Sequence, residues 1–368
     1  MPRPTVRVSL ALVVAVVAVV ACAGAGRGVP GAGQGAARVV LPEKPWPVKT
    51  REHVDLWLHG FAMVSDDNAT PVPLFRRGYK DALTVEKNRR GLLTRLDESR
   101  AELAQGYKAN RGYEAAQFFA LYFGSLAELL QAGQIYLKVD GEGRKAETPE
   151  ARAVIALFAS AFPEKRDRAW LKLFLDGLLD EEEKFYHEYW LAEQRARGPA
   201  LAAAEQVWLG VRPRLQPFLS GTKQPTGDLV LSLPLEGEGR TVKEGQSVVI
   251  ATSYPATPAQ GAEATYTFVH DAVATLAATQ VADQTSPAQK RDGTADRMLS
   301  AASVRGGAML LAAASADLVN GYARFYLQAA GRGDGGANPL GALERTFPIP
   351  DAVRDGMRRQ IDILLGGI

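Results

Sequence analysis

Cysteine is nearly absent from this chain of 368 residues, which has only Cys22. No disulfide can therefore form within one molecule, and no second thiol is present for a redox pair or a thiolate metal site. Histidine is also scarce, with four in the chain, so any imidazole-based site has few candidates. At this length and 46% apolar residues, burial alone can stabilise a sizeable core without cross-links.

Net charge is small as well. The formal charge is +2, and residues 1–21 hold two of the 43 basic residues and none of the 41 acidic ones, so the remainder is neutral. A nucleic-acid binder needs a basic face to neutralise phosphates, and we therefore expect no nucleic-acid partner. The chain also lacks a Gly-x-Ser-x-Gly elbow and a phosphate loop that opens a helix after a strand.

The apolar run over residues 11–20 is too short for a stable membrane span. With Arg3 and Arg7 before it, this run predicts a signal peptide over residues 1–21. It ends in Val19-Val20-Ala21-Cys22, which resembles the lipobox of bacterial lipoproteins. The resemblance implies that Cys22 is lipidated and that the protein is secreted across the inner membrane and anchored in the cell envelope, on the periplasmic or outer-membrane face. The alternative is ordinary secretion with cleavage after a small residue.

Residues 22–47 are rich in glycine, alanine and proline and have no periodicity, which predicts a flexible linker behind the lipid anchor. From residue 48 the apolar spacing becomes helical, and we expect a helical lobe over residues 48–220. Thr148-Pro149 is a helix start signal, because threonine caps a helix and proline fits its first turn. A second lobe, over residues 221–368, is expected to combine a small sheet with further helices.

Strand patterns are confined to residues 227–252, where Leu229, Leu231 and Leu233 alternate with other residues and turn sequences follow. These turns predict a small antiparallel sheet. The helix expected over residues 261–283 is apolar enough to be buried against it. The predicted fold class is therefore mainly α, multi-helical, with a small antiparallel β-sheet packed on this buried helix.

The same helix carries His270 next to Asp271. A strand followed by a buried helix with this pair resembles, over residues 229–283, a degenerate zincin-type metallopeptidase core, whose His-Glu-x-x-His motif holds zinc. The resemblance implies His270 as a metal ligand and Asp271 as a shortened catalytic base. Ala274 stands where the second histidine would be, so no cofactor is expected, with zinc as the alternative. The other interpretation is a partly buried histidine in an unrelated helical fold.

The remaining histidines are His53, His59 and His187. His53 and His59 project about 120° apart around one helix and cannot share a metal from it, although folding could bring any of the three to His270. His53 is predicted to lie in a solvated first turn. His187 follows Glu183 by four residues, a spacing that suits either a shared cation or an exposed helix face.

These patterns together predict a cell-envelope lipoprotein. Its helical body is expected to be a non-catalytic binding domain, metallopeptidase-like but degenerate, that holds a protein or peptide partner at the membrane surface. Two alternatives remain open. One is a zinc-dependent hydrolase that uses His270 and Asp271, and the other is a purely structural helical scaffold.

Overall fold

A computed structural model describes residues 46–65, 72–244 and 247–366. The predicted signal peptide and Cys22 therefore lie outside the described residues. The fold is mainly helical with one small sheet, which confirms the predicted fold class. No helix within the described ranges is both long and apolar enough to cross a membrane.

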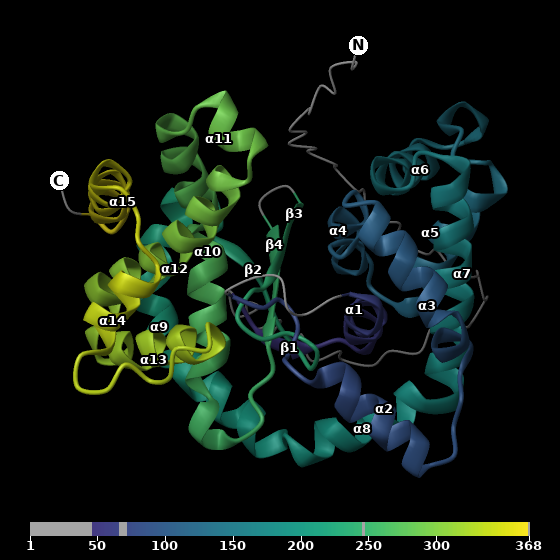
Figure 1. Cartoon of the computed structure of the whole chain (residues 1–368), viewed down its shortest axis with the longest axis horizontal. Helices are drawn as coiled ribbons and strands as arrows, with labels where there is room; N and C mark the ends of the chain where they lie inside the picture. The colour runs from purple at the N-terminus through teal and green to yellow at the C-terminus, as the bar shows by residue number, and fades with distance from the viewer. Residues whose placement is uncertain (1–45, 66–71, 245–246, 367–368) are drawn as a thin grey trace, which may run out of the picture.

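The sheet lies between two groups of helices (Figure 1). We call these the N-terminal lobe and the C-terminal lobe. The N-terminal lobe consists of α1 (Glu52–Val64), α2 (Tyr79–Arg89), α3 (Arg95–Ala109), α4 (Tyr113–Ala116), η1 (Phe119–Tyr122), α5 (Leu126–Lys138), η2 (Gly143–Lys145), α6 (Pro149–Ala161), α7 (Lys165–Glu181), η3 (Glu182–Tyr186) and α8 (His187–Ala196). The C-terminal lobe consists of α9 (Gly198–Gly221), η4 (Pro258–Gln260), α10 (Ala262–Gln284), α11 (Pro287–Arg291), α12 (Thr294–Ala314), η5 (Ala316–Leu318), α13 (Val319–Ala329), α14 (Pro339–Thr346) and α15 (Asp351–Leu364).

Four strands form the sheet, in the order β1-β2-β4-β3. They are β1 (Val48–Thr50), β2 (Thr226–Ser232), β3 (Arg240–Glu244) and β4 (Ser247–Ser253). β1 and β4 both pair with β2 in parallel, and only β3 runs antiparallel, to β4. The sheet is therefore mixed, and the prediction of an antiparallel sheet is wrong.

The error arises in the segment after β2, which does not turn back as a hairpin. Its backbone bonds instead to the segment before α2, with Glu236 N donating to Leu74 O at 2.9 Å and Gly237 N donating to Pro73 O at 3.0 Å. The chain thus leaves the sheet after β2 and returns as β3 on the far side of β4. A turn-like sequence in a local window cannot distinguish this path from a hairpin.

Each face of the sheet supports a separate core. Leu229, Leu231 and Ile250 pack in the core of the C-terminal lobe, whereas Val230 and Ala251, on the opposite face, pack in the core of the N-terminal lobe. Helices covering both faces of parallel strands explain why β2 is apolar at successive positions. The sheet thereby joins the two lobes into one folded unit.

The start of the folded body and the border between the two lobes differ from the predicted positions. Trp46, which the sequence placed in the linker, is 1% exposed, and its carbonyl accepts a hydrogen bond from Trp208 Nε1 at 2.8 Å. α9, predicted to belong to the first lobe, packs instead against α10 and η4 of the second. The predicted start of α6 is confirmed, because the Thr148 side chain accepts a hydrogen bond from Ala151 N.

Candidate functional site

The candidate site lies at β3, the edge strand of the sheet. β3 pairs on one side with β4, and among the described residues no backbone hydrogen bond outside the sheet involves residues 240–244. In an antiparallel pair every second residue directs its N–H and C=O away from the partner strand. β3 therefore presents unpaired backbone donors and acceptors along its outer edge.

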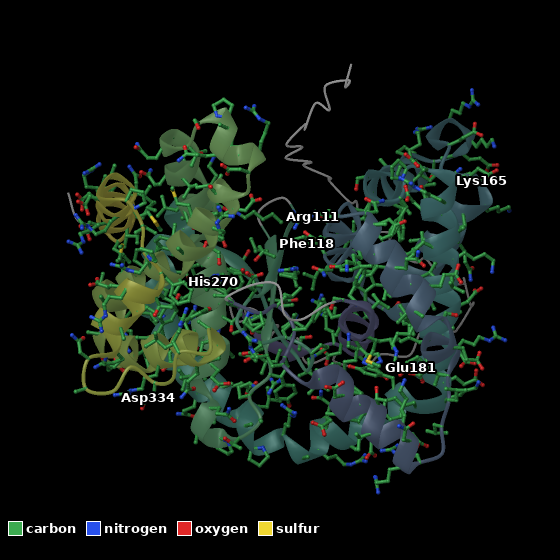
Figure 2. The ribbon with its side chains drawn as sticks, in the orientation of Figure 1. Arg111, Phe118, Lys165, Glu181, His270 and Asp334 are labelled. Carbon is green, nitrogen blue, oxygen red and sulfur yellow. The ribbon has the colours of Figure 1, made fainter. Side chains whose placement is uncertain are left out.

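A cavity of about 200 Å³ lies against this edge. Arg240 and Lys243 of β3 contribute to its lining, Asp271 and Ala274 of α10 form another part, and Phe118 closes it from the N-terminal lobe. Figure 2 shows Phe118 and His270 on opposite sides of the sheet region, in the two lobes. The cavity is thus a meeting point of both lobes and the open strand.

The first residue of β3 is held firmly. Arg240 donates from Nε and Nη2 to Gln117 Oε1, at 3.1 and 2.6 Å, and its guanidinium lies 5.3 Å from the centre of the Phe118 ring. Thr241 Oγ1 donates to Asp271 Oδ2 at 3.1 Å, which ties β3 to α10. Asp271 therefore helps to hold β3 in position against α10.

Lys243 differs from its neighbours in having no fixed partner. Its side chain is exposed, and within the described ranges no carboxylate forms an ion pair with it. A free ammonium beside an open strand edge favours an acidic group on whatever binds there.

His270 precedes the cavity-lining Asp271 on α10, does not line the cavity itself, and is 5% exposed. Its ring stacks on Tyr326 with centroids 5.4 Å apart, and neither ring nitrogen has a hydrogen-bond partner in the described part of the chain. Nδ1 lies 3.8 Å from Asp271 Oδ1, which is too far for a hydrogen bond. The structure therefore brings His270 and Asp271 together, but with little contact between them.

The surroundings of His270 do not fit a zinc ion. Zinc needs at least three protein donors, and in the described ranges no two further His, Cys, Asp or Glu donors converge on His270. Ala274, at the position of the second histidine in the zincin pattern, lines the cavity with a methyl group.

His53 and His59 are both buried on α1, at 6% and 0% exposure, and so the predicted solvated first turn at His53 is wrong. His53 Nε2 donates to Phe123 O at 2.8 Å, and burial lowers the pKa of this histidine, which favours the neutral ring. The His53 side chain points into the N-terminal lobe, and therefore it is not open to solvent, whereas Glu52 beside it is partly exposed.

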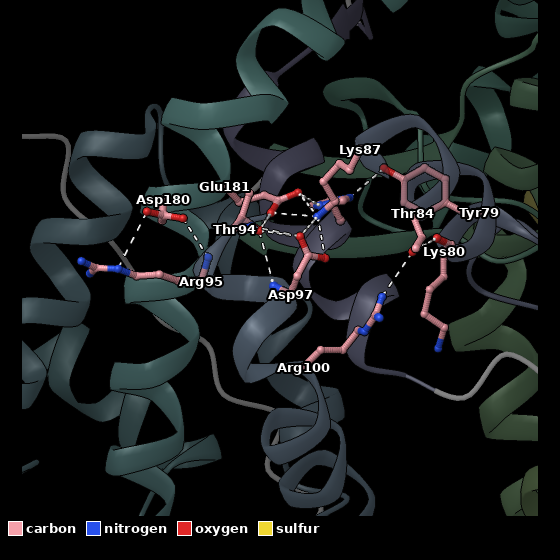
Figure 3. A network of polar contacts seen from close by, with 11 residues as sticks. Tyr79, Lys80, Thr84, Lys87, Thr94, Arg95, Asp97, Arg100, Asp180 and Glu181 are labelled. Carbon is pink, nitrogen blue, oxygen red and sulfur yellow. Dashed lines mark hydrogen bonds and ion pairs between the residues drawn. The ribbon is translucent and has the colours of Figure 1, made fainter. Parts of the chain in front are cut away.

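His59 belongs to a buried polar network, which Figure 3 shows around Glu181 and Lys87. Its Nε2 lies 3.0 Å from Glu181 Oε1 and its Nδ1 lies 3.1 Å from the Tyr79 hydroxyl. Lys87 Nζ donates to both carboxylate oxygens of Glu181, at 2.9 and 3.1 Å. Burial raises the pKa of Glu181, but its bonds to His59 and the charge of Lys87 outweigh this and lower the pKa to about 2. Both ring nitrogens of His59 are thus engaged within this network.

His187 is the exposed histidine, and its partners differ from the predicted one. Nδ1 contacts Glu52 Oε1 at 2.7 Å, and Glu182 also lies close by, whereas Glu183 is not part of the group. The hydrogen bond to Glu52 raises the pKa of His187. Sequence spacing missed both partners, since Glu52 is distant in the chain and Glu182 becomes a neighbour only because the helix widens locally.

The comparisons with known proteins add no assignment: no protein-family description, curated protein or solved structure matches this chain.

Proposed function

We propose that this protein is a non-catalytic binding domain that captures an extended peptide segment along β3. One observation carries the proposal: an edge strand without an outer partner borders a cavity to which both lobes contribute. Adding a strand to an open sheet edge is a general way to bind extended peptides, because backbone hydrogen bonds provide affinity and pockets beside the strand provide specificity.

The side chains around β3 indicate the chemistry of the segment. An apolar side chain fits against Phe118 and Ala274, and an acidic side chain can pair with Lys243. Arg240 and Thr241 are already bonded to Gln117 and Asp271, so they hold the strand rigid without competing for the ligand. A rigid edge limits the entropy lost on binding.

The zinc-dependent hydrolase is the less favoured alternative. It requires His270 to bind zinc with Asp271 as the base, yet the donors that would complete the site do not surround His270 in the described ranges. A purely structural scaffold would leave the open edge and its cavity without a role. A measurement of peptide binding at β3 therefore distinguishes the binding domain from the hydrolase and from the structural scaffold.

Strand addition can be tested at Lys243. If Glu244 and Ser247 close the β3–β4 hairpin as a hydrogen-bonded pair, the Lys243 N–H points outward. Proline at an outward position of an edge strand removes this donor while the sheet is retained. Peptides selected from a display library should lose about tenfold or more in affinity for Lys243→Pro.

The matched control is Lys243→Val, which keeps the donor and removes only the charge. It should weaken acidic peptides and leave neutral ones unchanged, as measured by fluorescence anisotropy. Peptide binding should also slow amide hydrogen exchange in residues 240–244. Selected peptides that bind Lys243→Pro as tightly as the wild type, without slowing this exchange, would disprove the proposal.

We also propose that the domain is displayed from the cell envelope through a lipid on Cys22. Support comes from the sequence alone, since this region lies outside the described residues. Intact-mass analysis of the protein made in a bacterium should show a diacylglyceryl addition at Cys22. Cys22→Ala should leave the membrane fraction, and its retention there would count against the anchor.

A further inference from the structure

Three metal-ligating side chains meet on the surface of the N-terminal lobe, away from β3. They are Glu52 in the first turn of α1, Glu182 in η3 and His187 at the start of α8, and one donor atom from each lies within 4.8 Å of the other two. The three come from two chain segments 130 or more residues apart. The fold, and not the local sequence, therefore assembles this group.

A π-helical turn makes the meeting possible. Residues five apart on an α-helix project about 140° apart, so Glu182 and His187 would face different directions. η3 instead closes with a bond from His187 N to Glu182 O, which is an i→i+5 bond. This wider turn stacks the two residues on one side of the helix, where Glu52 approaches them, and such turns are frequent at functional sites.

This group has two carboxylates and only one group that can carry a positive charge. Neither Glu52 nor Glu182 forms an ion pair with a lysine or arginine of the described chain, whereas the neighbouring Asp180 does so with Lys184. Two carboxylates lie beside one imidazole, and the Glu52 carboxylate contacts Nδ1 of the ring. A positive charge at this point is thus favoured.

We propose that Glu52, Glu182 and His187 form a binding site for a divalent first-row metal ion, with Zn²⁺ as the preferred occupant. One imidazole nitrogen and two carboxylate oxygens are donors that zinc accepts, and three protein ligands leave a position for water. With metal–donor distances of about 2.0–2.2 Å, tetrahedral donors lie about 3.4 Å apart. The 2.7 Å contact between His187 and Glu52 must therefore open slightly to admit the ion.

Occupation of this site would fasten the first turn of α1 to the junction of α7 and α8. The ion takes the place of the proton on His187 Nδ1, and binding therefore releases a proton. Zinc affinity is thus expected to fall as the pH is lowered from about 7.5 to about 5.5.

Calorimetric titration of the metal-free full chain with Zn²⁺ tests the site. The wild type should bind one zinc per chain, and His187→Ala and Glu182→Gln should each lower the affinity about tenfold or more. Glu183→Gln is the matched control, since it removes the adjacent carboxylate, and it should bind zinc as the wild type does. Zinc should also raise the Tm of the wild type and of Glu183→Gln, but not of His187→Ala.

Two results would overturn the proposal. One is the absence of stoichiometric zinc binding by the wild type at pH 7.5. The other is zinc binding that persists in both His187→Ala and Glu182→Gln. If His270→Ala abolished that binding instead, the ion would belong to α10, and the hydrolase alternative would gain support. The outcome is independent of peptide binding at β3, which is measured without metal.

Discussion

Replacing Lys87 with methionine should destabilise the protein strongly, although the new side chain has a similar volume. Lys87 is 2% exposed and Glu181 is 0% exposed, and the ammonium contacts both oxygens of Glu181 and both oxygens of Asp97 at 2.8–3.1 Å (Figure 3). Methionine keeps the stem of the lysine and so leaves little cavity. The perturbation is therefore a buried carboxylate that has lost its cation.

The expected loss of stability can be worked out from the contacts of Glu181. The pKa of Glu181 is about 2 against 4.5 for an ordinary glutamate, which corresponds to about 3 kcal/mol in favour of the ionised form. Lys87 shares this effect with His59 and Thr94, but its removal also leaves a desolvated charge. Breaking buried pairs in this way typically costs about 3–5 kcal/mol. We expect Lys87→Met to lower the free energy of unfolding by about 3 kcal/mol.

Urea unfolding followed by tryptophan fluorescence measures this loss. The double variant Lys87→Met/Glu181→Gln removes both charges and should cost less than the sum of the single variants, by about 1 kcal/mol or more. Lys172→Met is the control, because its partner Asp176 is exposed and such pairs contribute about 0–1 kcal/mol. If Lys87→Met unfolded at the same urea concentration as Lys172→Met, the reasoning about the buried network would be refuted.

Four further substitutions test stability. Burial raises the pKa of Asp55 to about 7, so the folded state holds a proton that the unfolded chain releases above pH 3.8. This contribution to the free energy of unfolding is present at low pH and is lost as the pH rises through about 7. In urea unfolding, the wild type should therefore lose about 2 kcal/mol relative to Asp55→Asn between about pH 5 and about pH 8. A difference between the two proteins that stays constant with pH would contradict this. Gly307→Ala should lower the Tm, because its Cβ would lie 2.1 Å from the Tyr322 hydroxyl, and overpacking of about 1–3 kcal/mol exceeds the helix-propensity gain of about 1 kcal/mol. Gly210→Ala, with no atom within 4 Å of its Cβ, should instead raise the Tm. Ser125→Ala should cost about 1 kcal/mol in urea unfolding, since the Ser125 side chain caps α5, and an unchanged midpoint would show that this cap is unimportant.

Local patterns in the sequence predicted the helices well. The start signal at Thr148-Pro149 and the buried helix over residues 261–283 correspond to α6 and α10. Strands within residues 227–252 were also predicted, yet the parallel pairing of β2 with β4 was not, because pairing depends on contacts between distant segments. The three residues of β1 gave no signal, since a strand so short has no measurable periodicity.

The candidate sites were also predicted only where their residues are close together in the sequence. His270 and Asp271 were found because they are adjacent in sequence, but the open edge of β3 depends on which strand lies beside it. His187 was assigned to Glu183 by α-helical spacing, and the π-helical turn selects Glu182 instead. Glu52 could not be linked to either residue before the lobe was folded.

Trp46 has a mechanical consequence. Its ring contacts Phe268 of α10 with centroids 5.0 Å apart, and the next residue, Pro47, accepts a hydrogen bond from Leu229 N. A pulling force applied through residues 1–45 would therefore first act on the buried Trp46 side chain and only then on β1. From β1 the force would pass through the sheet into both lobes. Single-molecule force spectroscopy should show an unfolding force peak for release of Trp46, and this peak should be absent in Trp46→Gly.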